Sequence, residues 1–289
     1  FRRVLFRSLV YGRYWALQQI RKICCILHYK KKYETFEKNH FMRVAGNLFL
    51  DYERVIQVIG VPRSGTTLLC SILNNHSKVL CISEPFLAFM TARSFEWSDK
   101  DSVFRVSLKA PIRFINHYLK YNTGVIAFKE TFRSEDDDYY PSESFIHENI
   151  RSGIKTIAVF RDPRAVWYST VTRFDEAETE MPSLLFFRTW NTFIEKYWNH
   201  AGNVLCIRYE DLVRDPATSA ELVFRFLHVE YEGIGVSLPA TVGKGDTRAH
   251  RGGHVDSTSL NKWSALSTSA KREILHNCGK GMQEVGYVQ

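Results

Sequence analysis

Short apolar runs of strand length alternate along the chain with stretches whose apolar residues recur at helical spacing. The runs that predict strands are Val55–Ile59, Lys78–Ser83, Val125–Phe128, Lys155–Phe160 and Val204–Tyr209. Helices are predicted from Thr66, within residues 86–123, from Pro163, over Leu184–Asn199 and over Ser267–Val285. Strands that alternate with helices are typical of a parallel sheet covered by helices on both faces. The pattern therefore predicts an α/β, three-layer fold with a central parallel sheet flanked by helices.

The first strand leads into a loop bracketed by Gly60 and Gly65, and a helix follows at once. Free N–H groups and the helix dipole make such a turn an anion site, to which Ser64, Thr66 and Thr67 add hydroxyl donors. The glycine spacing is that of a P-loop, but Thr66 stands where the P-loop has a lysine. Without that lysine we do not expect ATP or GTP hydrolysis, and Arg63 supplies the cation instead. The loop predicts a P-loop-like site for phosphate or sulfate.

A carboxylate follows the second predicted strand, in the pair Glu84-Pro85. Open parallel sheets bind ligands at the carboxyl ends of their strands, so Glu84 is a candidate general base beside the loop. The alternative is that Glu84 is a cap partner for a helix that starts at Pro85. His76 is the next candidate for the base.

The charge of the chain is concentrated at one end. The net charge is +8, and residues 1–50 hold 11 Lys/Arg against 2 Asp/Glu, whereas the remainder holds 28 basic and 29 acidic residues. We therefore expect a basic N-terminal arm (1–50) and one catalytic domain (51–289) that does not bind nucleic acid. Residues 13–32 predict a basic amphipathic helix. It could contact an anionic membrane surface or form a stem, but packing on the domain is the interpretation we favour.

Three further absences limit the function. No apolar run approaches the roughly 18 residues of a transmembrane helix, and no signal peptide is visible. The chain begins at Phe1, and residues 1–8 look like translated adapter sequence. The six cysteines form no C-x-x-C pair, so we expect no metal site.

Pro62–Thr67 resembles the 5′-phosphosulfate loop of sulfotransferases that use 3′-phosphoadenosine 5′-phosphosulfate (PAPS), especially the tyrosylprotein and Golgi carbohydrate branches. Three later motifs match the family in the same order: Arg161-Asp162-Pro163 with Ser169, Arg208-Tyr209-Glu210, and Lys262-Trp263. The likeness covers roughly Val55 to Tyr287. The resemblance implies metal-independent, in-line transfer of a sulfuryl group from PAPS to an acceptor hydroxyl, with PAP as the product.

The resemblance also implies roles for single residues. Arg63, Ser64, Gly65, Thr66 and Thr67 would hold the 5′-phosphosulfate, and Lys129 would donate to the bridging oxygen of the leaving phosphate. Arg161, Ser169, Arg173 and Lys262, with its neighbour Trp263, would hold the 3′-phosphate, and Tyr209 would lie near the adenosine. Glu84 lies at the same distance in sequence from the loop arginine, Arg63, as the catalytic glutamate of the tyrosylprotein sulfotransferases. A Walker B carboxylate is an alternative for Asp162, but two separated motifs favour the 3′-phosphate site.

The acceptor stays open between a peptide tyrosine, a sugar hydroxyl and a small molecule. In tyrosylprotein sulfotransferases Thr-Arg follows the glutamate, whereas here Pro85-Phe86 follows, as in the carbohydrate branch. Residues 86–123 are expected to form helices, rich in Phe and Tyr, that wall the acceptor pocket, with their aromatic side chains in the core rather than on the substrate. The unpatterned loop 233–261 is expected to cover the cofactor. In that loop, the arginines and glycines around His250 and His254 suit an anion better than a metal.

Compartment and oligomeric state also stay open. The chain reads as cytoplasmic as it stands, or as Golgi-luminal if an N-terminal anchor precedes it. Two other functions fit parts of the pattern: a P-loop kinase or nucleotidase, and a non-catalytic protein that binds anions or membranes through its basic arm.

Overall fold

The computed structural model describes residues 49, 51–85, 100–132, 143–174, 183–200, 202–233, 242–243, 255 and 257–288. Within these ranges the side chains of residues 100–110, 143–145, 173–174 and 242–243 are not described. The expected basic arm, apart from Phe49, lies outside the described residues. So do residues 86–99 of the expected acceptor wall, and most of the expected loop 233–261 with both of its histidines.

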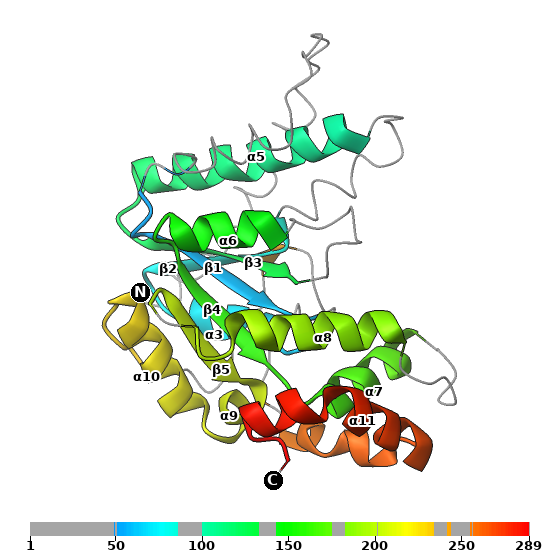
Figure 1. Ribbon diagram of the computed structural model, residues 1–289. Helices are drawn as coiled ribbons and strands as arrows, with labels where there is room; N and C mark the ends of the chain where they lie inside the picture. The colour runs from blue at the N-terminus through cyan, green and yellow to red at the C-terminus, as the bar shows by residue number, and fades with distance from the viewer. Residues whose placement is uncertain are drawn as a thin grey trace.

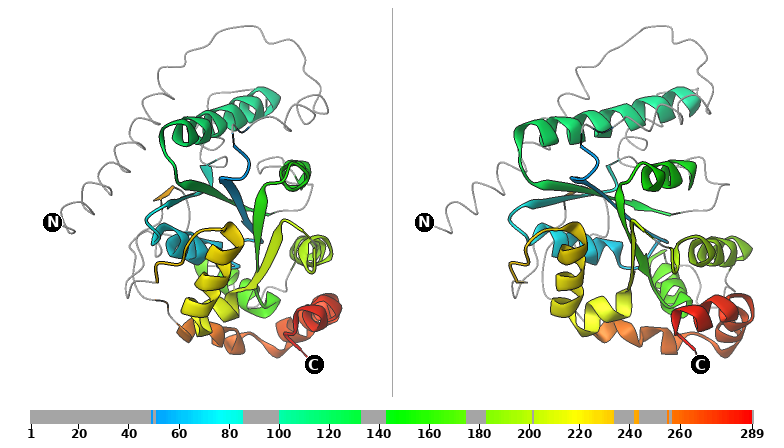
Figure 2. Two further views of the ribbon diagram at one scale, coloured as in Figure 1. Left: turned by 90° about the vertical axis from the view of Figure 1, so that its left-hand side faces the viewer. Right: turned by 60° about the vertical axis from the view of Figure 1, so that its left-hand side comes forward.

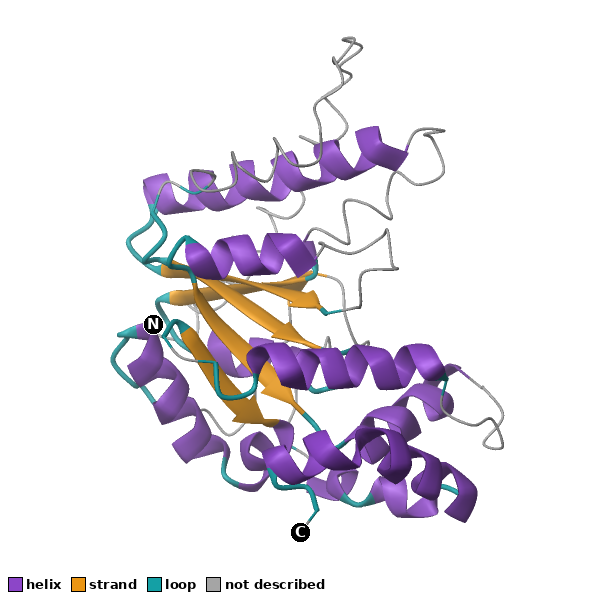
Figure 3. Cartoon of the chain, viewed as in Figure 1, coloured by secondary structure: helices purple, strands orange, loops and turns teal. Residues whose placement is uncertain are grey.

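The fold is built on one sheet of six strands (Figures 1 and 3). The strands are β1 (Val55–Gly60), β2 (Val79–Ser83), β3 (Val125–Thr131), β4 (Lys155–Phe160), β5 (Val204–Arg208) and β6 (Val242–Gly243). Their order is β5-β4-β1-β3-β2-β6, and every neighbouring pair is parallel. All six residues of β1 are buried, as expected of a strand covered on both faces. The α/β prediction is confirmed.

Helices cover both faces of the sheet (Figure 2). On one face lie α3 (Thr66–Asn74), α9 (Tyr209–Arg214) and α10 (Pro216–Leu227), which share a core cluster with alternate residues of β1 to β5. On the other lie α5 (Lys100–Tyr121), α6 (Glu143–Arg151), α7 (Pro163–Phe174), α8 (Leu184–Tyr197) and α11 (Thr268–Val285). Two 3-10 helices, η3 (Ser257–Leu260) and η4 (Lys262–Ala265), precede α11. None of the described helices combines the length and the apolar character needed to cross a bilayer.

Four strand boundaries differ from the prediction: β1 ends one residue later, β2 begins one residue later, and the ends of β3 and β5 bear on the site. β3 continues three residues beyond Phe128 because its pairing with β1 runs on to Gly60 opposite Thr131, so Lys129 lies within the strand rather than after it. β5 ends at Arg208, and Tyr209 opens helix α9. Glu210 and Asp211 lie in the first turn of α9, where carboxylates interact favourably with the helix dipole.

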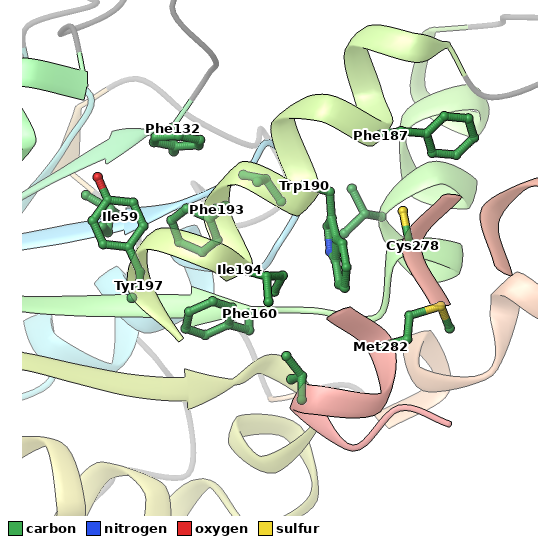
Figure 4. Close-up of a cluster of buried hydrophobic side chains, with 14 of the residues drawn as sticks. Ile59, Phe132, Phe160, Phe187, Trp190, Phe193, Ile194, Tyr197, Cys278 and Met282 are labelled. Carbon is green, nitrogen blue, oxygen red and sulfur yellow. The ribbon is translucent and has the colours of Figure 1, made fainter. Parts of the chain in front are cut away.

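The second core cluster joins α8 to α11. Figure 4 shows Trp190 of α8 between the body of the domain and the Cys278 and Met282 side chains of α11. Trp190 is 1% exposed, and its Nε1–H donates to the carbonyl oxygen of Arg161 at 3.1 Å. The same side chain therefore fills the core and fixes the backbone at the end of β4.

Two glycines of α11 form a matched test of this packing. A Cβ on Gly281 would lie 2.8 Å from Cζ3 of Trp190, whereas a Cβ on Gly279 would meet nothing closer than 3.8 Å. We expect Gly281→Ala to lower the free energy of unfolding by about 1–3 kcal/mol through overpacking. Gly279→Ala should instead raise it by about 0.5–1 kcal/mol, because alanine favours the helix. Urea unfolding of both variants checks the pair, and equal effects would contradict the packing.

Candidate functional site

The candidate site lies where five parallel strands end side by side. In the order of the sheet, the predicted residues are Tyr209 after β5, Arg161 after β4, the loop 61–65 after β1, Lys129 near the end of β3, and Glu84 after β2. Because neighbouring strands lie about 4.8 Å apart, this edge forms a continuous row of polar groups. Residues that are up to 146 positions apart in the sequence, Arg63 and Tyr209, are thus brought together.

The loop after β1 turns the chain into α3 with two residues in the left-handed region. These are Arg63 (φ 67) and Gly65 (φ 93), and a left-handed non-glycine residue is a mark of local strain at functional loops. Gly65 is the N-cap of α3 and offers no side chain to cap it, so the first N–H groups of the helix face the loop. Ser64 is fully buried, and its Oγ has no hydrogen-bond partner among the described residues.

Arg161 connects the loop to the end of β4. Its Nη1 donates to the carbonyl oxygen of Arg63 at 2.8 Å, and its guanidinium lies 4.1 Å from the centre of the Tyr209 ring. The residue is 8% exposed, and its buried Nε has no partner among the described residues. Burial lowers the pKa of this guanidinium, while nearby Tyr209 and Glu210 act in the opposite direction. A buried cation with an unused donor suits a bound anion.

Arg63 reaches in turn to helix α7. Its Nε donates to Oγ of Ser169 at 3.0 Å. The cation predicted to hold the 5′-phosphosulfate and the hydroxyl predicted to hold the 3′-phosphate, 106 residues apart, are therefore in direct contact.

Lys129 and Glu84 form a second group at the other side of the loop. Lys129 Nζ lies 2.6 Å from Oε1 of Glu84, and Thr131 Oγ1 donates to the same oxygen at 2.9 Å. The Lys129 and Glu84 side chains are 3% and 12% exposed, so the pair is largely desolvated. The Glu84 amide donates to the Lys129 carbonyl at 2.7 Å, and Glu84 has a left-handed φ of 50°. The backbone thus turns sharply where the carboxylate is presented, which is typical of functional positions.

A set of buried charges supports the start of α7. Arg164 binds both carboxylate oxygens of Asp162, at 2.6 Å in the shorter contact, and stacks 3.9 Å from the centre of the Trp263 ring. The Asp162 amide donates to Oε1 of Glu210 at 3.1 Å. Burial raises the pKa of the Glu210 carboxyl above its usual range. Asp162 therefore makes structural contacts at the helix start.

The residues predicted to hold the 3′-phosphate differ in how the described contacts connect them to the site. Trp263 reaches the site through Arg164, whereas Lys262 is exposed on η4, which packs against α7. Arg173 lies on α7 one turn beyond Ser169, and its side chain is outside the described residues. The role of each residue stays a prediction.

The prediction of His76 as the alternative base is wrong. It lies in the turn between α3 and β2, at the end of β2 opposite to Glu84. Its Nδ1 accepts from the Lys78 amide at 3.0 Å, and its Nε2 lies 2.7 Å from the Glu230 carbonyl oxygen. Both ring nitrogens are therefore committed to backbone groups on the far side of the sheet.

Four residues of the site were not found from the sequence: Thr131, Arg164, Trp190 and Ser259. Thr131 was missed because β3 was predicted to end too early. Ser259 binds the Tyr209 hydroxyl at 2.7 Å from a segment without periodicity. Arg164 follows Pro163 in the motif that resembles the family's, and this motif was the sequence signal that could have pointed to Arg164. Trp190 lies on the helix predicted over Leu184–Asn199, where an aromatic side chain suggests only core packing; it is core, and it also binds the Arg161 carbonyl.

Comparison with known proteins gives the family. The family model described as the sulfotransferase domain matches residues 53–242, which include strands β1 to β5 and the loop. A protein of Caenorhabditis briggsae named "Putative protein-tyrosine sulfotransferase" is 26% identical over 197 residues, which are 63% of this chain and 68% of that protein.

Solved structures agree in fold. A mouse sulfotransferase complexed with PAP has a TM-score of 0.52 at 15% identity, over 88% of this chain and 95% of that chain. A sulfotransferase domain of a Synechococcus olefin synthase has a TM-score of 0.51 at 19% identity, over 81% and 95%. These likenesses confirm the predicted P-loop-like sulfotransferase fold. The family match also removes the kinase or nucleotidase and the non-catalytic anion-binding protein. The chain belongs to the sulfotransferase domain family and is a PAPS-dependent sulfotransferase.

Proposed function

We propose that this enzyme moves the sulfuryl group of PAPS to the hydroxyl of a peptide tyrosine, with Glu84 as general base and Lys129 as the acid. The observation that carries the proposal is the Lys129–Glu84 pair, held at 2.6 Å beside the loop that follows β1. The acceptor class is supported by the name of the nematode relative.

The described residues fit a ligand with phosphate groups at two ends. Near the loop, the buried Ser64 Oγ lacks a partner, and the first turn of α3 has no side-chain cap. Next to it, the buried Arg161 Nε lacks a partner among the described residues as well. Unsatisfied buried donors cost stability, so their presence on both sides of Arg63 supports two neighbouring anion subsites. We assign the loop, Lys129 and Arg63 to the 5′ end, and Arg161, Ser169, Arg173, Tyr209, Lys262 and Trp263 to the 3′ end.

PAPS supplies the sulfuryl group and a phosphate leaving group. Arg63 and Lys129 would neutralise charge on the 5′-phosphate, which needs preorganised donors rather than covalent chemistry. Lys129 can also give a proton to that phosphate.

Glu84 would take the proton of the acceptor hydroxyl. Its Oε1 is held by Lys129 and Thr131, so the carboxylate is oriented before the acceptor arrives. Within the described part of the chain, both of these contacts fall on Oε1, which leaves Oε2 to face the acceptor.

A sugar hydroxyl is the second candidate acceptor, because Glu84 is followed by Pro85 as in the carbohydrate branch. Transfer of labelled sulfuryl from PAPS to three pools separates the candidates: acidic tyrosine peptides, desulfated glycans, and small alcohols and phenols. Label in the tyrosine peptides is the expected result. Label only in another pool would overturn the tyrosine assignment and keep the donor site.

Glu84→Gln removes the base while the side chain keeps its size and can still accept from Lys129. We expect kcat to fall by about 10²-fold or more, with the dissociation constant of PAP nearly unchanged. Glutamine is preferable to alanine here, because a truncated side chain would leave the buried Lys129 without a partner.

Glu221→Gln is the matched control, since Glu221 is exposed on α10 and its loss changes the net charge equally. A kcat within about twofold of the wild type in Glu84→Gln would exclude Glu84 as the base.

Lys129→Met keeps the aliphatic bulk within β3 and removes the ammonium group. We expect kcat to fall by about 10²-fold or more, because the leaving phosphate loses its proton donor. Steady-state kinetics with a saturating acceptor measure the change, and the same charge is removed in Lys120→Met, on the exposed end of α5. If both variants turned over like the wild type, Lys129 would not be the acid.

A further inference from the structure

Contacts among Arg63, Arg161, Tyr209 and Gly65 form a closed circuit that joins the two ends of the proposed donor site. Arg161 Nη1 donates to the Arg63 carbonyl in the loop, and the Arg161 guanidinium stacks on the Tyr209 ring at 4.1 Å. The Tyr209 ring lies directly on Gly65, because a Cβ added there would clash with Cδ2 of that ring. Gly65 closes the circuit, since it is two residues beyond Arg63 in the same loop.

The contact with Arg63 falls where the loop needs support. Arg63 is a non-glycine residue with φ 67, a conformation that costs free energy and persists only when neighbouring groups hold it. A hydrogen bond from a charged donor to its own carbonyl fixes that peptide unit and the direction of the following amides. Arg161 provides this bond with a side chain that is 8% exposed and therefore dry.

Arg161 is itself held from behind. The Trp190 indole donates to its carbonyl oxygen at 3.1 Å, and Trp190 is 1% exposed in the core. Its guanidinium is confined between the Tyr209 ring and the loop. Arg161 is thus a rigid strut between β4 and the loop rather than a side chain that waits in solvent.

We propose that Arg161 is a positioning residue for the 5′-phosphosulfate loop, in addition to its proposed contact with the 3′-phosphate. The inference rests on the proposed division of the donor site into 3′ and 5′ ends. It holds that Arg161, with Tyr209, keeps Arg63 and the amides of the loop in the conformation that binds the 5′ end. Removal of Arg161 then weakens ligands that carry no 3′-phosphate.

Two probes separate this role from simple 3′-phosphate binding. PAP carries both phosphates, and AMP carries the 5′-phosphate alone. For Arg161→Ala we expect AMP binding to weaken by about tenfold, and PAP binding to weaken more, both measured by titration calorimetry. Lys262→Ala is the matched control. It removes an exposed cation on η4, outside the circuit that holds the loop, so it should weaken PAP and leave AMP unchanged.

Arg161→Lys separates positioning from charge. It keeps the positive charge that attracts AMP over distance, but it lacks the planar fork that stacks on Tyr209 while it reaches the Arg63 carbonyl. We expect Arg161→Lys to weaken AMP binding nearly as much as Arg161→Ala does. Full recovery of AMP affinity in this variant would show that only charge matters, and would overturn the positioning role.

Hydrogen exchange on the ligand-free protein decides the matter without a ligand. Amides of the loop peptide 61–67 should exchange about tenfold faster in Arg161→Ala and in Arg161→Lys, and amides of β3 should not change. Unchanged exchange in the loop, or unchanged AMP binding in Arg161→Ala, overturns the inference while the donor site stands. A wild-type protein that does not bind PAP would instead overturn the proposed donor site itself.

Discussion

The central position of β1 in a parallel sheet is the constraint on which the site depends. Because β4 lies on one side of β1 and β3 on the other, the loop after β1 has Arg161 on one flank and Lys129 on the other. The outer strands β5 and β2 then add Tyr209 and Glu84 at the two ends of the row. The sheet order thus arranges the proposed donor contacts along one line, with the proposed base at the acceptor end.

Desolvated charge is concentrated on both flanks of this loop. Lys129 is 3% exposed and Arg161 is 8% exposed, and a buried cation is costly unless it is paired. Lys129 has Glu84 as its partner, whereas Arg161 has the Arg63 carbonyl and an aromatic ring, and one N–H group without a partner among the described residues. The two cations therefore differ in how their charge is compensated. The first is neutralised by the proposed base, and the second keeps an unsatisfied donor that an anion can use.

The fold and the positions of the strand-end residues could be predicted because they follow from local patterns. Buried apolar runs located every strand but the two-residue β6, and Gly60 with Gly65 located the loop. The features that could not be predicted depend on pairing between distant segments. The extension of β3 to Thr131 follows from its register with β1, and this extension places a hydroxyl on Glu84. The start of α9 at Tyr209 and the Arg161–Arg63 bond likewise need the sheet order, which no single segment contains.

The donor end of the proposed site lies on the sheet, whereas the acceptor end lies beyond it. Tyr209, Arg161, Arg63 and Lys129 lie in or directly beside paired strands, so the sheet limits where they can be. The proposed acceptor would meet the residues after Glu84, beyond the last residue of β2, where the chain has left the sheet. Residues that lie after a strand can change without altering the sheet, and one scaffold can then serve many acceptors. We therefore expect specificity for the acceptor to depend on the segments after β2 rather than on the residues that identify the family.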